Sequence, residues 1–186
     1  MILIIGLGNK GKVYEKTRHN VSWVVFNYLN GDLDWQPNKY AKSLLATTSF
    51  DDKDIVFVKP ETFMNKSGEV LDYFKKEYKV SVDDLIIIHD DIDLPLGKIK
   101  VSYDRGDGGH NGVKSIMNNL GSASFIRIRI GVSILDENNN LHKPDVLGLF
   151  SKEEMKMIKE KISPEVGKII ETIVLKGKEV AMNKFN

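Results

Sequence analysis

The stretch Leu85-Ile86-Ile87-Ile88-His89-Asp90-Asp91-Ile92-Asp93 places the most hydrophobic short run of the chain directly before three carboxylates. Four large apolar residues in a row, without polar alternation, are typical of a strand that is covered on both faces of a sheet. Such a strand lies inside an α/β sheet, and the polar residues after it lie at the carboxyl edge, where ligands of these folds bind. The stretch therefore predicts a central strand and the edge at which to look for a site.

Shorter apolar runs on both sides of this stretch predict further strands, and helical patterns alternate with them. The predicted strands are Ile2–Ile5, Leu44–Phe50 and Ile55–Val58 joined by Asp51-Asp52-Lys53 as a hairpin, Ile99–Tyr103, and a half-buried strand in which Ile126, Ile128 and Ile130 alternate with Arg127, Arg129 and Gly131. The predicted helices cover Val21–Leu29, Val70–Tyr78 capped by Asn65 or Ser67, Val113–Leu120 closed by Gly121, and two helices from about Lys152 onward separated near Ser163-Pro164. Hairpin and βαβ signals together indicate an α/β fold with a mixed sheet.

Composition excludes several classes of protein. The chain has 186 residues, 41% hydrophobic and 28% charged, which suits a globular domain. Without cysteine it has no disulfide framework, thiolate metal site or cysteine nucleophile. No apolar run approaches the ~20 residues that span a bilayer, and no basic region precedes the first apolar run as in a secretory signal. We therefore expect a cytoplasmic protein with no membrane contact.

The net charge of +1 bears on possible partners. By itself it favours a small-molecule enzyme over a nucleic-acid-binding protein. Because affinity for nucleic acid grows with each phosphate that a basic residue neutralises, any nucleic-acid surface here must gather its cations locally.

Gly6-Leu7-Gly8-Asn9-Lys10-Gly11 matches the glycine pattern of dinucleotide-binding folds, and Asp32 follows about twenty residues later. That site requires a helix that opens within the glycines and an acidic residue at the end of a second strand. Here helical periodicity begins only near Asn20, and Asp32 follows the end of that helix. The pattern is a weak signal for dinucleotide binding.

Polar residues gather where predicted strands end and helices begin. They are Gly8-Asn9, Thr17-Arg18-His19-Asn20, Phe63-Met64-Asn65, His89-Asp90-Asp91-Ile92-Asp93 and Gly108-Gly109-His110-Asn111-Gly112. Attack of water on an acyl group needs a base that titrates near neutral pH, a group that orients the base, and donors for the oxyanion. Histidine, aspartate and asparagine supply these roles, so the pattern favours direct attack by water over a covalent intermediate.

Each of these residues also has a structural interpretation. His19 fits a helix cap or a surface position, and His89 fits packing at a strand end. His110 fits a role in holding the glycine loop, and His142 fits an exposed position. The acidic run Asp90–Asp93 fits a turn, or a chelating site for a metal such as magnesium.

Taken in order, these motifs resemble the bacterial-type peptidyl-tRNA hydrolases over most of the chain. The matching segments are Gly6-Leu7-Gly8-Asn9 with Tyr14 and Thr17-Arg18-His19-Asn20, Lys59-Pro60-Glu61-Thr62-Phe63-Met64-Asn65-Lys66-Ser67-Gly68, His89-Asp90-Asp91-Ile92-Asp93-Leu94-Pro95-Leu96-Gly97, Gly108-Gly109-His110-Asn111-Gly112-Val113-Lys114-Ser115, and Phe125-Ile126-Arg127-Ile128-Arg129-Ile130-Gly131 with Val146-Leu147.

The resemblance implies one α/β/α domain over residues 1–186 with a twisted mixed sheet. It implies a cytoplasmic monomer that needs no cofactor, no metal and no obligate protein partner. The implied activity is hydrolysis of the ester between a peptide and the 3′-terminal ribose of tRNA, which recycles tRNA from prematurely released peptidyl-tRNA. His19 is then the general base, Asp90 steadies its basic form, and Asn9 distinguishes blocked from free aminoacyl groups. The implied substrate contacts are Tyr14, Phe63, Met64, Asn65 and Asn111, and either Asn65 or Asn111 shares the oxyanion.

One departure concerns the tRNA backbone. A basic residue that clamps a tRNA phosphate in the family falls at Ser102 here. The sequence predicts that nearby cations replace it, namely Lys98, Lys100, Arg105 and Arg129. The alternatives to this function are a non-catalytic RNA-binding relative, which is expected to have lost His19 or Asp90, a dinucleotide-binding enzyme, and a metal-dependent hydrolase.

Overall fold

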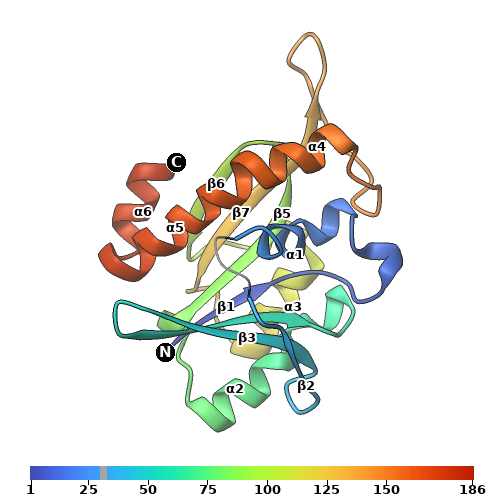
Figure 1. Ribbon diagram of the computed structural model, residues 1–186. Coiled ribbons are helices and arrows are strands. Elements are labelled where there is room, and N and C mark those ends of the chain that lie inside the picture. Colours follow the sequence, from blue (N-terminus) through green and yellow to red (C-terminus); the bar gives the residue numbers. More distant parts are fainter. Residues whose placement is uncertain (30–32) are drawn as a thin grey trace.

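The computed structural model describes residues 1–29 and 33–186 (Figure 1). Asp32, the acidic residue of the dinucleotide hypothesis, lies outside the described residues. No helix of the described ranges is both long enough and apolar enough to cross a membrane.

Eight strands of the described residues form a mixed sheet in the order β2-β3-β4-β1-β5-β7-β6, and β8 extends β7. The strands are β1 (Ile2–Gly6), β2 (Gln36–Asn38), β3 (Ser43–Phe50), β4 (Lys53–Pro60), β5 (Leu85–Pro95), β6 (Ile99–Tyr103), β7 (Ile126–Leu135) and β8 (Leu141–His142). The middle strands β4, β1, β5 and β7 are parallel, whereas β2, β3, β6 and β8 add antiparallel pairs. The mixed sheet and the hairpin of β3 and β4 are confirmed.

Helices cover both faces of this sheet (Figure 1). The α-helices are α1 (Val21–Phe26), α2 (Val70–Tyr78), α3 (Asn111–Leu120), α4 (Lys152–Met157), α5 (Ser163–Lys176) and α6 (Lys178–Phe185). The short helical segments are η1 (Lys12–Tyr14), η2 (Arg18–Asn20), η3 (Met64–Glu69), η4 (Val82–Asp84) and the π-helical turn η5 (Ile158–Ile162). Helices α2 and α3 pack on one face, and α1, α5 and α6 pack on the other. This is the α/β/α arrangement that the resemblance implied.

Strand β5 is one of the inner strands of the sheet, as the opening stretch predicted. It lies between β1 and β7. Ile86 and Ile88 belong to the core under α1 and α5, while Leu85 and Ile87 belong to the core under α2 and α3. All four are at most 1% exposed. Burial on both faces explains why this run lacks the polar alternation of an edge strand.

Several helix boundaries differ from the prediction, and α1, for example, ends at Phe26 rather than at Leu29. The expected break at Ser163-Pro164 is wrong, because α4, η5 and α5 run on continuously. The π turn is wider than an α turn, and Ser163 Oγ donates to the Ile158 carbonyl across it. This accommodates Pro164, which has no N–H to donate and whose ring crowds the preceding turn. The chain instead turns at Gly177, whose φ is 86°.

The predicted cap of α2 is also wrong. Asn65 and Ser67 lie inside the 3-10 segment η3, which leads directly into α2. The Ser67 hydroxyl donates to the Met64 carbonyl within that segment. The hydrophobic periodicity located α2 correctly but did not show the extra turns in front of it.

We predict that Gly68→Ala destabilises the fold, because a Cβ at this position overlaps the backbone carbonyl of Ser115 in α3. Forced overpacking of this kind costs about 1–3 kcal/mol, which lowers Tm by several degrees. The matched control is Gly106→Ala, since a Cβ there meets nothing within 4 Å. Thermal unfolding of both variants checks this, and equal Tm values would contradict it.

Candidate functional site

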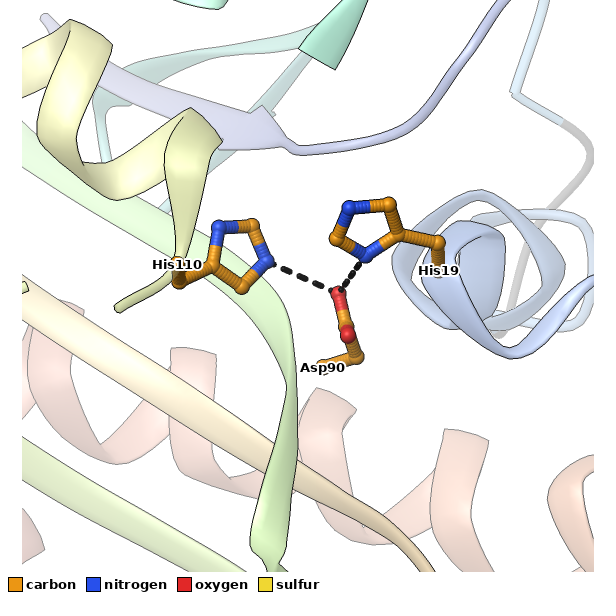
Figure 2. A group of neighbouring side chains, drawn as sticks. All are labelled: His19, Asp90 and His110. Carbon is orange, nitrogen blue, oxygen red and sulfur yellow. Dashed lines mark hydrogen bonds and ion pairs between the residues drawn. The ribbon is translucent and has the colours of Figure 1, made fainter. Parts of the chain in front are cut away.

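Three side chains from distant parts of the chain meet at the carboxyl edge of the sheet (Figure 2). Asp90 comes from β5, His19 from η2, and His110 immediately precedes α3. The Nδ1 atom of His19 and the Nε2 atom of His110 each lie 2.8 Å from the same oxygen, Oδ1 of Asp90. The predicted pairing of His19 with Asp90 is thus present in the structure.

The backbone fixes the tautomer of His110. Its Nδ1 atom accepts hydrogen bonds from the N–H groups of Gly112 and Val113, at 3.1 and 3.3 Å. A nitrogen that accepts carries no proton, so the proton of the neutral ring is on Nε2. His110 is therefore both the N-cap of α3 and a donor to Asp90.

Asp90 is 3% exposed, yet its environment favours the carboxylate. Burial by itself raises its pKa, but the charge and hydrogen-bond interactions with His110 and then with His19 outweigh burial. The net pKa of Asp90 lies well below that of an ordinary aspartate. An ionised carboxylate can only accept, so His19 donates from Nδ1 and its Nε2 keeps a lone pair. This is the tautomer that a general base requires.

The turn that carries His19 is fixed on both sides. The backbone N–H of His19 donates to the Val146 carbonyl at 2.8 Å. The preceding Arg18 is 6% exposed, binds both carboxylate oxygens of Glu154 in α4 and donates to the Val132 carbonyl. Because these contacts come from three other elements, the imidazole is held without relying on the short helix η2.

A cavity of about 630 Å³ opens beside His19, a size typical of ligand sites. Of the predicted site residues, it is lined by His19, Asp90, Lys100, Arg105, Asn111 and Arg129. These positions span the chain from η2 to β7. The predicted gathering at one edge is therefore confirmed for this group.

The cations of the cavity differ in how they are held. Arg129 pairs with Asp91 through contacts of 2.6 Å, and its side chain is 28% exposed. Arg127 was expected on the open side of a half-buried strand, but it is only 2% exposed. Both of its terminal nitrogens donate to carbonyls of the glycine-rich loop, at Arg105 and Gly106, and so the loop covers it. Lys100 and Arg105 are exposed.

Ser102 and His89 also line this cavity from the sheet. Ser102, where the resemblance implied that a phosphate clamp is missing, is 8% exposed. His89 is 4% exposed and donates from Nδ1 to the Asp90 carbonyl. Burial lowers the pKa of His89 to about 3. It is a neutral, buried ring inside β5, in line with the structural interpretation of this residue.

Asn9 and Met64 lie just beyond the cavity. Asn9 is 7% exposed, and its Oδ1 accepts from the Met64 backbone N–H at 2.9 Å. Its backbone exchanges two hydrogen bonds with the side chain of Asn20, next to His19. Met64 is 5% exposed and packs toward Gly112 at the start of α3. The end of β1 is thereby tied to the turn of His19.

Four predicted substrate or tRNA contacts line other surfaces. Phe63 is 54% exposed and faces a separate cavity of about 370 Å³, together with Lys10 and Lys66. Asn65 is exposed on η3, Lys98 is exposed between β5 and β6, and Tyr14 is half-buried in η1. The structure does not bring these four into the cavity beside His19.

His110 is the residue that sequence reasoning underestimated. It was assigned only to holding the glycine loop, whereas it contacts Asp90 directly. Its place between two glycines and the first residue of a helix was visible in the sequence. A helix that starts at the carboxyl edge of the sheet lies beside the ends of the strands, and that position was the available signal.

Metal and dinucleotide sites were tested against the same geometry. Among the described residues, the cluster with metal-ligand spacing is His19, Asp90 and His110, whose candidate atoms lie within 4.8 Å of one another. Two hydrogen bonds of 2.8 Å to one oxygen already satisfy these atoms. The glycine pattern after β1 leads into η1 and η2, and α1 begins only at Val21. It therefore lacks the helix start that holds a pyrophosphate.

Comparisons with known proteins agree with this geometry. A family model described as peptidyl-tRNA hydrolase matches residues 3–186. The chain is 42% identical over 188 positions to the peptidyl-tRNA hydrolase of Clostridium perfringens, covering 100% of this chain and 97% of the relative. It is also 42% identical over 189 positions to that of Bacillus subtilis, with 100% and 98% covered.

Solved structures show the same fold. The crystal structure of peptidyl-tRNA hydrolase from Acinetobacter baumannii matches with a TM-score of 0.85 and 27% identity, covering 100% of this chain and 94% of that one. Sequence, fold and the meeting of His19 with Asp90 all lead to one assignment. The chain belongs to the peptidyl-tRNA hydrolase family.

Proposed function

We propose that this chain hydrolyses the ester of peptidyl-tRNA by direct attack of a water molecule activated by His19. The observation that carries the mechanism is the 2.8 Å contact between His19 Nδ1 and Asp90 Oδ1, which leaves Nε2 as the base. Membership of the family supports the reaction and the substrate. A positioned base of this kind contributes about a hundred- to ten-thousandfold in rate.

The reaction balances without a cofactor. His19 Nε2 takes a proton from water as the water oxygen bonds to the ester carbonyl carbon. Asp90 stabilises the imidazolium that forms. The tetrahedral intermediate then expels the terminal ribose oxygen, which takes the proton from His19. The products are a peptide carboxylic acid, which releases its proton to solvent, and a tRNA with a free 3′ end.

Oxyanion stabilisation is assigned to Asn111 rather than to Asn65. Asn111 lines the cavity that contains His19 and stands in the first turn of α3. Asn65 lies on η3, outside that cavity. An amide N–H₂ group and the positive end of a helix both favour developing negative charge.

Asn9 has the chemistry to distinguish blocked substrates from free ones. Because its Oδ1 is engaged by the Met64 N–H, its orientation is fixed and its Nδ2 group is presented as a donor. The acylated nitrogen of peptidyl-tRNA brings a carbonyl that can accept this donor. A free aminoacyl group carries an ammonium instead and offers no acceptor there.

Lys100 and Arg105 are the cations of the cavity best placed to meet tRNA phosphates, because both are exposed there. Arg129 shares its charge with Asp91, so its contribution is smaller. With few cations available, tRNA recognition rests on a few phosphates and on the chemistry of the 3′ end.

A non-catalytic RNA-binding relative is disfavoured, since His19 and Asp90 are both present and in contact. The monomeric state, the cytoplasmic location, the single domain and independence from cofactors and metals stay predictions. A metal-dependent hydrolase would lose activity on treatment with EDTA, whereas we expect no loss. A dinucleotide-binding enzyme would gain thermal stability with NADH.

Incubation with N-acetyl-aminoacyl-tRNA and with its unblocked counterpart tests the function. We expect the wild-type chain to cleave only the blocked ester, and His19→Ala to reduce turnover by about a hundred- to ten-thousandfold while tRNA affinity stays nearly unchanged.

The matched control is His142→Ala, because His142 is an exposed histidine paired with Asp136 on the distant hairpin. It should cleave at the wild-type rate. Near-normal turnover by the His19 variant would remove this residue from the role of base.

The lowered pKa of Asp90 predicts a pH-dependent contribution to stability. Between its folded value and the unfolded value of about 3.9, the unfolded chain binds more protons, so stability rises with pH. The contribution is complete above about pH 5 and is lost on acidification. The stability difference between wild type and Asp90→Asn should therefore be larger at neutral pH than at about pH 3.

Urea unfolding at both pH values measures this difference. Asp93→Asn is the control, because Asp93 is 59% exposed and pairs with an equally exposed lysine. A difference for Asp90→Asn that does not change with pH would contradict the ionised state of this carboxylate.

Arg105→Ala should weaken tRNA binding and reduce the slope of log affinity against log salt by about 1, as expected for one lost phosphate contact. Lys76→Ala, at an exposed lysine of α2 outside the cavity, is the control and should leave the slope unchanged. Binding titrations at several salt concentrations measure this. Equal slopes for wild type and Arg105→Ala would place the tRNA elsewhere.

A further inference from the structure

One carboxylate oxygen serves two imidazoles in this site (Figure 2). Oδ1 of Asp90 accepts from His19 and from His110, each at 2.8 Å. The two rings are 4.9 Å apart between centroids. Because one oxygen has a limited capacity to accept, the two donors share its electron density. The strength of one hydrogen bond therefore depends on the other.

His110 is not free to leave this arrangement. Its Nδ1 atom is engaged by two backbone N–H groups of α3, and its side chain is only 9% exposed. These two bonds occupy the Nδ1 lone pair and orient the ring, so that Nε2–H points at Asp90. His110 is thus a fixed donor, and it couples the amino end of α3 to the carboxylate.

We propose that His110 is a positioning residue that sets the pH range of the reaction. By donating to the oxygen that holds His19, it weakens the pull of Asp90 on the His19 proton. His19 then becomes available as the base at a lower pH than it would if Asp90 accepted a hydrogen bond from His19 only. This inference rests on the proposed role of His19 as the base, and it concerns a property that the role alone does not fix.

Among the described residues, the charged groups around His19 other than Asp90 make no side-chain hydrogen bond or ion pair with His110. Asp91 is paired with Arg129, and Asp93 with Lys143. Arg127 is bound to the glycine-rich loop. The remaining titratable groups lining the cavity are Lys100, Arg105, Asp107 and the buried His89, whose ring centroid lies 4.8 Å from that of His110. On the element of His19 itself, Arg18 is paired with Glu154. A shift in the pH profile of a His110 variant can therefore be assigned to the lost donor.

Two substitutions separate the two roles of His110, which donates to Asp90 and caps the start of α3. In His110→Asn, the amide oxygen replaces Nδ1 and keeps the cap of α3, but nothing reaches Asp90. In His110→Gln, the longer amide replaces Nε2–H and keeps the donor, but the cap is lost. We expect the midpoint of the kcat/KM profile to move up by roughly one pH unit in His110→Asn, as for the loss of one charge-assisted hydrogen bond. In His110→Gln we expect a wild-type midpoint and a lower Tm.

An unmoved or lowered midpoint in His110→Asn, with the blocked ester still cleaved by the wild type, would overturn this inference while leaving the proposed function intact. Failure of the wild type to cleave would instead overturn the function. Nitrogen NMR of the wild-type rings gives a readout that needs neither variants nor activity. We expect the neutral His110 ring to carry its proton on Nε2, because Nδ1 accepts from the backbone. A neutral His110 ring with its proton on Nδ1 would equally reject the proposal.

Discussion

The buried carboxylate of Asp90 is the interaction on which the site depends. A charge that is 3% exposed is unfavourable unless donors replace the water that it loses. Here the donors are two imidazoles that lie 71 and 20 residues away in the sequence. The carboxylate in turn decides which nitrogen of His19 carries the proton. The ionised state of Asp90 and the tautomer of His19 therefore depend on each other, and both depend on the fold that brings these residues together.

The fold supplies this geometry by fixing each partner to a rigid element. Asp90 follows the four fully buried residues of β5, whose two covered faces leave it little freedom to move. His110 is held by the first N–H groups of α3, a helix packed on the same sheet. The turn of His19 is anchored through Arg18 to Glu154 of α4. Each anchor lies outside the cavity, so substrate can enter without disturbing the dyad.

The cavity beside His19 carries both positive and negative side chains, which fits the proposed substrate, because only part of peptidyl-tRNA is nucleic acid. The chain has a net charge of +1, and the cavity mixes cations of β6, β7 and the glycine-rich loop with carboxylates of β5. The pairing of Arg129 with Asp91 neutralises part of this surface. Affinity for an RNA backbone grows with every phosphate that a cation neutralises. Under the proposed function, a surface with few free cations therefore favours recognition of the acylated 3′ end over binding of a long stretch of RNA backbone.

The sequence by itself determined the buried inner strand, the mixed sheet, the weakness of the dinucleotide pattern and the candidacy of His19 and Asp90. These follow from local apolar periodicity and from residue chemistry, which act over a few positions. Only the tertiary structure decided that His110 shares the oxygen of Asp90, that Arg127 is covered by the loop, and that α4 continues into α5 through a π turn. The physical reason is that these features arise from contacts between segments far apart in the chain, or from one widened turn within a helix, and neither leaves a periodic trace in the sequence.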